Sequence, residues 1–111
     1  MRQAAALLGM LFSAAALAHV HLRDSSPADG SHLSSSPPAL VLNFSEAAQL
    51  TAVSLELPGG AQQKLSVPAG SATRLSVALP QLAPGDYRVR WRALARDGHV
   101  VPGEIHFRIG P

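Results

Sequence analysis

One segment restricts the possible folds of this chain more than any other, an uninterrupted two-residue alternation that follows Pro84-Gly85. Tyr87, Val89, Trp91 and Ala93 take one side of it, and Arg88, Arg90 and Arg92 take the other. Because successive side chains of a strand point to opposite faces, the pattern predicts a half-buried antiparallel strand. Trp91 is expected to be a core residue, because it shares the apolar face with Tyr87 and Val89.

Shorter segments of the same kind occur on both sides of this strand. They are residues 40–44, 53–57, 65–67, 75–77 and 105–109, and Pro- and Gly-rich turns separate them. Residues 25–30 and 34–38 have the composition of turns and loops, and no segment beyond residue 18 has a convincing helical period. About seven short strands between turns predict an all-β chain folded as a single immunoglobulin-like Greek-key β-sandwich.

The first 18 residues have the pattern of a secretory signal peptide. Arg2 gives a positive start, residues 4–18 carry no charge, and Ala16-Leu17-Ala18 has the form after which signal peptidase cuts. The apolar run is shorter than the roughly 20 residues of a membrane-spanning helix, although an uncleaved anchor is the alternative. We therefore expect residues 1–18 to be removed, leaving an exported domain of residues 19–111 that begins at His19.

Charge and sulfur content limit what such a domain could bind. Once Arg2 is removed, the domain has eight Lys and Arg and seven Asp and Glu. This nearly neutral balance does not indicate binding to nucleic acid or to anionic lipid. The chain has no cysteine, and its two methionines, Met1 and Met10, both lie in the predicted signal peptide. A transition-metal site would have to use histidine, carboxylate, backbone or terminal amine. These ligands suit Cu(II), Zn(II) or Ni(II), whereas Cu(I) prefers sulfur.

Five histidines follow the predicted cleavage site: His19, His21, His32, His99 and His106. His106 alternates with the inward-facing residues of its predicted strand, so we expect it on the solvent face. His32 is expected in a Ser-rich loop. His19 differs, because cleavage after Ala18 gives it a free α-amine. That amine and its own Nδ1 could chelate one metal ion, although a terminal histidine can also be coincidence. His21 strengthens the metal interpretation, because residues i and i+2 share a face of an extended segment.

The second candidate motif is Asp97-Gly98-His99. Asp-Gly between two strands is a favoured hairpin turn, so Asp97 could simply brace that turn. Alternatively, Asp97 and His99 project to one side and offer a carboxylate and an imidazole to a metal ion. Spacing alone does not decide between the two. Catalytic motifs are lacking: the sequence has no Gly-x-Ser-x-Gly elbow, no Gly-rich phosphate loop and no His-Glu-x-x-His.

Taken in order, several motifs resemble the CopC family of periplasmic copper-binding proteins. They are His19-Val20-His21-Leu22, Ser26-Pro27-Ala28-Asp29-Gly30, Leu42-Asn43-Phe44-Ser45-Glu46, residues 85–92, Asp97-Gly98-His99 and Gly103. The resemblance implies a seven-stranded cupredoxin- or immunoglobulin-like β-barrel and a role in copper resistance or homeostasis. It also implies a Cu(II) site made by His19, Asp97 and His99. In some members the residue equivalent to Glu46 lies at the site, and His21 matches a histidine of open role.

The sequence departs from part of the family in one segment. Some members carry a Met-rich segment that forms a Cu(I) site, but residues 57–68 here contain neither methionine nor histidine. The chain therefore resembles the members with a single Cu(II) site. The resemblance also implies a CopD-like inner-membrane copper transport protein as a separate partner. The mature protein is expected to be a soluble periplasmic monomer.

Three functions remain open from the sequence. The first is a copper carrier or buffer, with copper as the bound ion and no enzymatic activity. The second is a copper oxygenase, since a terminal histidine with a second histidine forms the copper brace of polysaccharide oxygenases; a domain of this size hardly supplies their broad substrate surface. The third is a metal-free accessory or adhesion domain.

Overall fold

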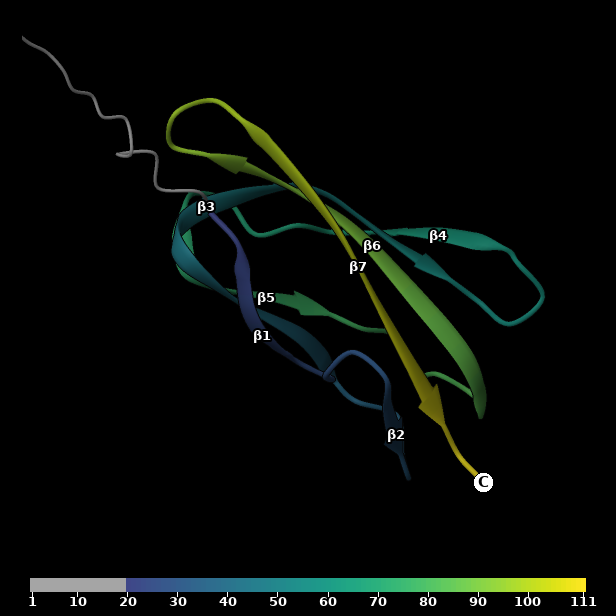
Figure 1. Cartoon of the computed structure of the whole chain (residues 1–111). Coiled ribbons are helices and arrows are strands. Elements are labelled where there is room, and N and C mark those ends of the chain that lie inside the picture. Colours follow the sequence, from purple (N-terminus) through teal and green to yellow (C-terminus); the bar gives the residue numbers. More distant parts are fainter. Residues whose placement is uncertain (1–19) are drawn as a thin grey trace, which may run out of the picture.

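The fold consists of strands. The structure, a computed structural model, describes residues 20–111, and these contain seven strands and no helix, hence none able to cross a membrane. The strands are β1 (Leu22–Ser26), β2 (Ser31–Leu33), β3 (Ala39–Glu56), β4 (Gln62–Leu65), β5 (Ala72–Ala78), β6 (Gly85–Ala95) and β7 (Val100–Ile109). They form one curled sheet whose halves face each other (Figure 1). The predicted all-β sandwich is confirmed.

The long strand β3 takes part in both halves of the curled sheet. Its first part, residues 39–44, pairs with β1 and β5, and its second part, residues 48–56, pairs with β6 and β4. At the bend, Ala48 pairs with Ala72 of β5 and with Ala95 of β6. One half therefore reads β1-β3-β5, and the other reads β4-β3-β6-β7-β2. The β2–β7 pair is the parallel one.

The prediction of separate strands at residues 40–44 and 53–57 is wrong, because both lie in β3. In β3 the buried residues up to Leu50 are even-numbered, and those beyond it, Val53 and Leu55, are odd-numbered. The ladder to β6 explains the change of parity. Leu50 pairs with Ala93 and Ala52 with Arg92, so Thr51 is an extra residue. A β-bulge of this kind inserts one residue and reverses which side chains face inward.

Three other predictions of local structure need correction. Residues 25–30 include the end of β1, and His32 lies in β2 instead of in a loop. The predicted strand at residues 65–67 ends at Leu65, as the last residue of β4. His32 remains exposed as expected, but its Nε2 is hydrogen-bonded to the Gly110 carbonyl. These strands have too few apolar residues to give a periodic signal, and pairing with longer neighbours defines them.

Aromatic side chains fill the space between the two halves. Trp91 is 4% exposed and meets Phe44 edge to face, with ring centroids 5.1 Å apart. Across the ladder from Trp91 lies Gly103, where a Cβ atom would fall 2.1 Å from Cζ2 of the indole. Glycine is therefore required at this inward position, because the tryptophan ring occupies the space of its side chain. The prediction that Trp91 is a core residue is confirmed.

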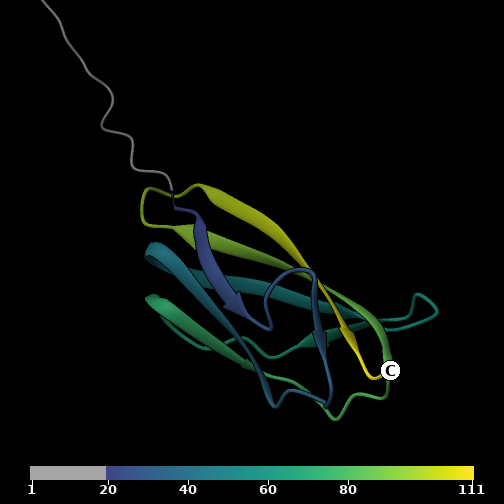
Figure 2. The same ribbon diagram turned by 60° about the horizontal axis from the view of Figure 1, so that its bottom comes forward.

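The pairing of β3 brings the beginning of β1 close to the end of β6. Because Ala48 pairs with β5 and β6 on opposite edges of β3, and because β5 also occupies its own edge along residues 39–43, β1 must lie on the same edge as β6. β1 and β6 therefore follow one another along that edge. The described chain consequently starts beside the turn that joins β6 to β7 (Figure 2).

Candidate metal centre

The start of the described chain is held against β3 by two hydrogen bonds between His21 and Ser45. The His21 N–H donates to Ser45 Oγ at 3.0 Å, and the Ser45 N–H donates to the His21 carbonyl at 2.8 Å. Ser45 precedes Ala48 by three residues, and Ala48 pairs with Ala95, the last residue of β6. Three residues of strand span about 10 Å. His21 is therefore fixed about that far along β3 from the point where the β6–β7 turn begins.

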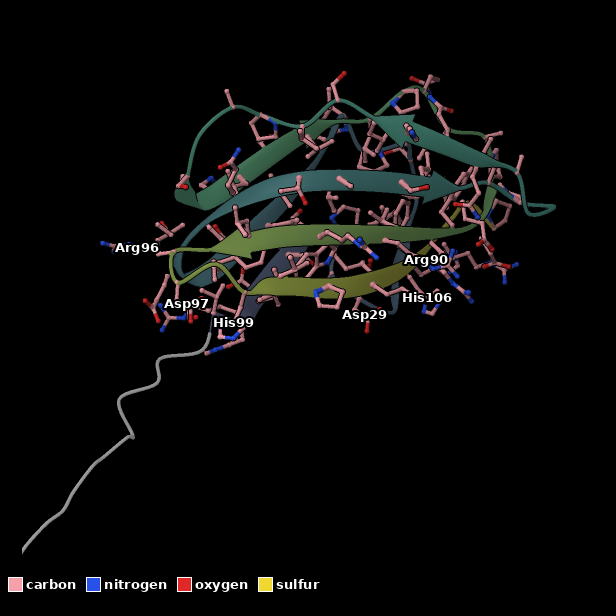
Figure 3. The ribbon with its side chains drawn as sticks, turned by 90° about the horizontal axis from the view of Figure 1, so that it is seen from above. Asp29, Arg90, Arg96, Asp97, His99 and His106 are labelled. Atoms are coloured by element: carbon pink, nitrogen blue, oxygen red, sulfur yellow. The ribbon has the colours of Figure 1, made fainter. Side chains whose placement is uncertain are left out.

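The turn itself is a tight, hydrogen-bonded loop. The Ala95 N–H donates to the His99 carbonyl at 2.8 Å, and the Gly98 N–H donates to the Ala95 carbonyl at 3.0 Å. Gly98 has a φ of 93°, a left-handed conformation that favours glycine. Asp97 and His99 flank it and project from the end of the sheet (Figure 3). Their side chains are 50% and 77% exposed.

Asp97 and His99 contact each other directly. Oδ1 of Asp97 accepts the His99 backbone N–H at 3.0 Å, and Oδ2 lies 2.8 Å from His99 Nδ1. The backbone hydrogen bond from His99, followed by the one from its ring, lowers the pKa of Asp97 below its ordinary value of 3.8. The carboxylate is therefore ionised at neutral pH. When Nδ1 donates to Asp97, a neutral imidazole presents an unprotonated Nε2 to solvent.

Four of the predicted site residues lie within the described part of the chain. Asp97 and His99 are in contact, His21 immediately precedes β1, and Glu46 follows Ser45 in β3 and is half-buried. His19 lies outside the described residues, immediately before Val20. Within residues 20–111, no three His, Cys, Asp or Glu side chains cluster closely enough to hold one metal ion.

The geometry shows Asp97 as a brace of its turn, and its function as a metal ligand stays a prediction. Its two hydrogen bonds from His99 brace the Asp-Gly turn, and they also fix a carboxylate and an imidazole side by side. Ser45 was missed by sequence reasoning, although it lies in the Phe44-Ser45-Glu46 motif. Its hydroxyl and backbone position the segment that carries His21. A serine in a strand has no signal of its own, because only the fold shows which backbone it meets.

The other described histidines lie elsewhere. His106 is exposed on the outer face of β7, as predicted, with Nε2 2.7 Å from Arg88 Nε and 3.2 Å from a Glu104 carboxylate oxygen. Its backbone N–H donates to Asp29 Oδ1 at 2.8 Å. Figure 3 shows His106 and Asp29 along the sheet, away from Asp97 and His99. His106 therefore serves as a control residue for the candidate centre.

Comparison with known proteins decides the family. The family model described as CopC domain matches residues 22–110. The chain belongs to the CopC family. Copper resistance protein C of Pseudomonas syringae pv. tomato is 35% identical, over 91% of this chain and 88% of the relative. The resemblance inferred from the ordered motifs is confirmed.

Solved structures agree with this membership. The crystal structure of CopC from Methylosinus trichosporium OB3b superposes with a TM-score of 0.74 at 30% identity, over 84% of this chain and 95% of that one. PcoC, a methionine-rich copper resistance protein from Escherichia coli, gives a TM-score of 0.61 at 26% identity, over 83% and 99% of the two chains. The CopC sandwich is therefore shared with proteins of copper resistance.

Proposed function

We propose that the mature protein is a periplasmic Cu(II)-binding protein that carries or buffers copper in copper resistance or homeostasis. The observation that supports this best is the approach of the chain start to the Asp97–His99 turn, imposed by the shared edge of β3. Membership of the CopC family and the likeness to copper resistance protein C point the same way.

The proposed ligands are the α-amine and Nδ1 of His19, a carboxylate oxygen of Asp97 and an imidazole nitrogen of His99. Three nitrogens and one oxygen form a tetragonal set, which suits Cu(II), and Cu(II) also heads the affinity order of divalent metals at such sites. Glu46 and His21 are proposed as residues of the same end of the sheet that contact the ion or its water. Because no described residue is a cysteine or methionine, the centre is proposed to hold Cu(II) and to release Cu(I).

Export is part of the proposal, because only cleavage after Ala18 frees the amine of His19. Residues 1–18 are proposed to be the signal peptide and residues 19–111 the copper-binding domain. The protein is proposed to act as a soluble monomer and to exchange copper with a CopD-like inner-membrane protein. We propose no catalytic role. Steady formation of peroxide from ascorbate and oxygen by the copper-loaded protein would favour an oxygenase instead.

The test combines intact mass with chelator competition on the exported protein. Mass spectrometry should give a chain that begins at His19 and gains one copper ion. Competition with a Cu(II) chelator should then show weaker binding for Asp97→Ala and for His99→Ala, and unchanged binding for His106→Ala. Equilibrium dialysis that finds no bound copper would favour the metal-free accessory domain.

A further inference from the structure

A groove crosses the outer face of the sheet half formed by β4, β3, β6 and β7. It encloses about 680 Å³. Five of the residues used below come from neighbouring positions of the strand pairing: Lys64, Arg90, Arg92, Pro102 and Glu104. Val67, which follows β4, also lines the groove. We call this surface the outer groove. Figure 3 shows Arg90 along the sheet, separated from Arg96 and Asp97 at its end, whereas Pro102 lies at the part of the groove nearer to them in the chain.

The outer groove is hollow at its middle because Ala52, which pairs with Arg92 and faces outward, has a small side chain. The backbone of Gly103 also lines the groove. Pro102 and Val67 add apolar surface. Val67 is 36% exposed, and only it and Val100 are exposed large hydrophobic residues within the described part of the chain. The groove can therefore accept an apolar side chain of moderate size.

The charges around the outer groove are unbalanced. Arg90 is paired with Glu56 at 3.0 Å and with Glu104 at 3.4 Å. By contrast, the side chains of Lys64 and Arg92, both exposed, make no hydrogen bond or ion pair with any residue of 20–111. Two unpaired cations thus flank an apolar hollow. Such a surface complements a carboxylate-bearing segment that carries an apolar residue.

We propose that the outer groove is the docking site for a short acidic segment of a partner protein. An apolar side chain of that segment occupies the hollow, and its carboxylates pair with Lys64 and Arg92. An anionic membrane fits less well, because the cations line a concave groove and the exported domain is close to neutral overall. Ion pairs with two exposed cations orient the partner segment and raise its rate of encounter more than they raise its affinity. Such binding suits a transient partner.

The position of the outer groove would place a docked partner near the candidate metal centre, an inference that rests on the proposed function. Pro102 follows His99 by three residues of the chain. That separation is about 10 Å along a strand. A partner segment in the groove therefore brings its own protein beside the Asp97–His99 turn, where copper would be handed over.

The probe is a blocked synthetic peptide, Asp-Glu-Leu-Glu-Asp, with an Asn-Gln-Leu-Gln-Asn peptide as its uncharged match. Titration into the ¹⁵N-labelled processed protein at low salt should shift amide signals in residues 51–54, 64–67, 90–92 and 103–104. The double variant Lys64→Glu/Arg92→Glu should bind about tenfold more weakly. Arg74→Glu is the matched control, since Arg74 is exposed on β5 in the other half of the sheet. It should bind as the parent does.

Several results would overturn the docking site. These are no shifts with the acidic peptide, equal shifts with the uncharged peptide, or an equal loss in Arg74→Glu. Sedimentation with phosphatidylglycerol vesicles in the absence of peptide shifts would identify the surface as membrane-binding instead. Copper titrations of the same variants are run in parallel. Peptide binding without copper binding contradicts the proposed function alone, and copper binding without peptide binding contradicts the docking site alone.

Discussion

The carboxylate of Asp97 accepts two hydrogen bonds from His99, one from its backbone N–H at 3.0 Å and one from its ring at 2.8 Å. A single residue thus holds both the turn and the imidazole. These hydrogen bonds show Asp97 as a brace of the turn, whereas its function as a metal ligand is a proposal. The two functions predict different effects of removing the charge of Asp97.

Asp97→Asn separates the two functions. Its amide oxygen can still accept one hydrogen bond from His99, so the melting temperature of the metal-free protein should stay close to that of the parent. The lost charge should weaken Cu(II) binding by at least about tenfold. Thermal melts and chelator competition measure the two effects. A large drop in melting temperature with unchanged affinity would assign Asp97 to the turn alone.

The terminal amine should matter as much as the His19 ring. A protein that begins Met-His19 keeps every side chain but turns that amine into an amide nitrogen, which binds metal poorly unless deprotonated. Its Cu(II) affinity should fall sharply below that of the processed protein. Because Cu(II) displaces the amine proton, affinity of the processed protein should rise with pH up to about 8. Competition with a chelator at fixed pH makes the comparison, and equal affinities would remove the amine from the site.

Trp91 and Gly103 should behave as one packing unit. Trp91→Ala empties a buried aromatic site and should cost about 3–5 kcal/mol of unfolding free energy. Gly103→Ala places a Cβ against the indole and should cost about 1–3 kcal/mol. Trp91→Leu removes the ring atoms that collide, so adding Gly103→Ala to Trp91→Leu should cost less than it costs in the parent. Urea unfolding of the parent, Gly103→Ala, Trp91→Leu and the double variant gives the coupling, and strictly additive costs would contradict the contact.

Acid should weaken the ion pair of Glu56. Hydrogen bonds from Gln62 and then from Arg90 lower the pKa of Glu56 below its ordinary value of 4.5. The resulting stabilisation is present above the ordinary pKa and is lost as the pH falls through the lowered value. Glu56→Gln should therefore melt at a lower temperature than the parent near neutral pH. The gap should close in more acidic buffer, and a gap constant down to about pH 3 would contradict the assignment.

Sequence periodicity predicted the inner faces of the fold but not the course of the chain. Leu42 and Phe44 share one parity and Val53 and Leu55 the other, which indicated two strands. A bulge at Thr51 produces the same pattern within one strand, and periodicity cannot distinguish the two cases. The short strands β1 and β2 also had no periodic pattern in the sequence, because pairing with distant strands defines them.

The candidate centre was predictable only in part. Its residue types followed from the histidines, the carboxylates and the resemblance to CopC proteins. That the chain start and the Asp97–His99 turn lie at one end depends on which edge of β3 each strand occupies, and nothing local in the sequence records this. The contact of Ser45 with His21 depends on the same pairing.

The double pairing of β3 has a consequence for the way the molecule comes apart. Ala48 pairs with strands of both halves, so neither half can separate unless β3 loses its pairing with the other half. The two faces of the sandwich therefore form a single cooperative unit, and opening one melts both. The turn that carries Asp97 and His99 follows β6, which pairs with this shared strand, so the candidate metal centre depends on the integrity of the whole domain.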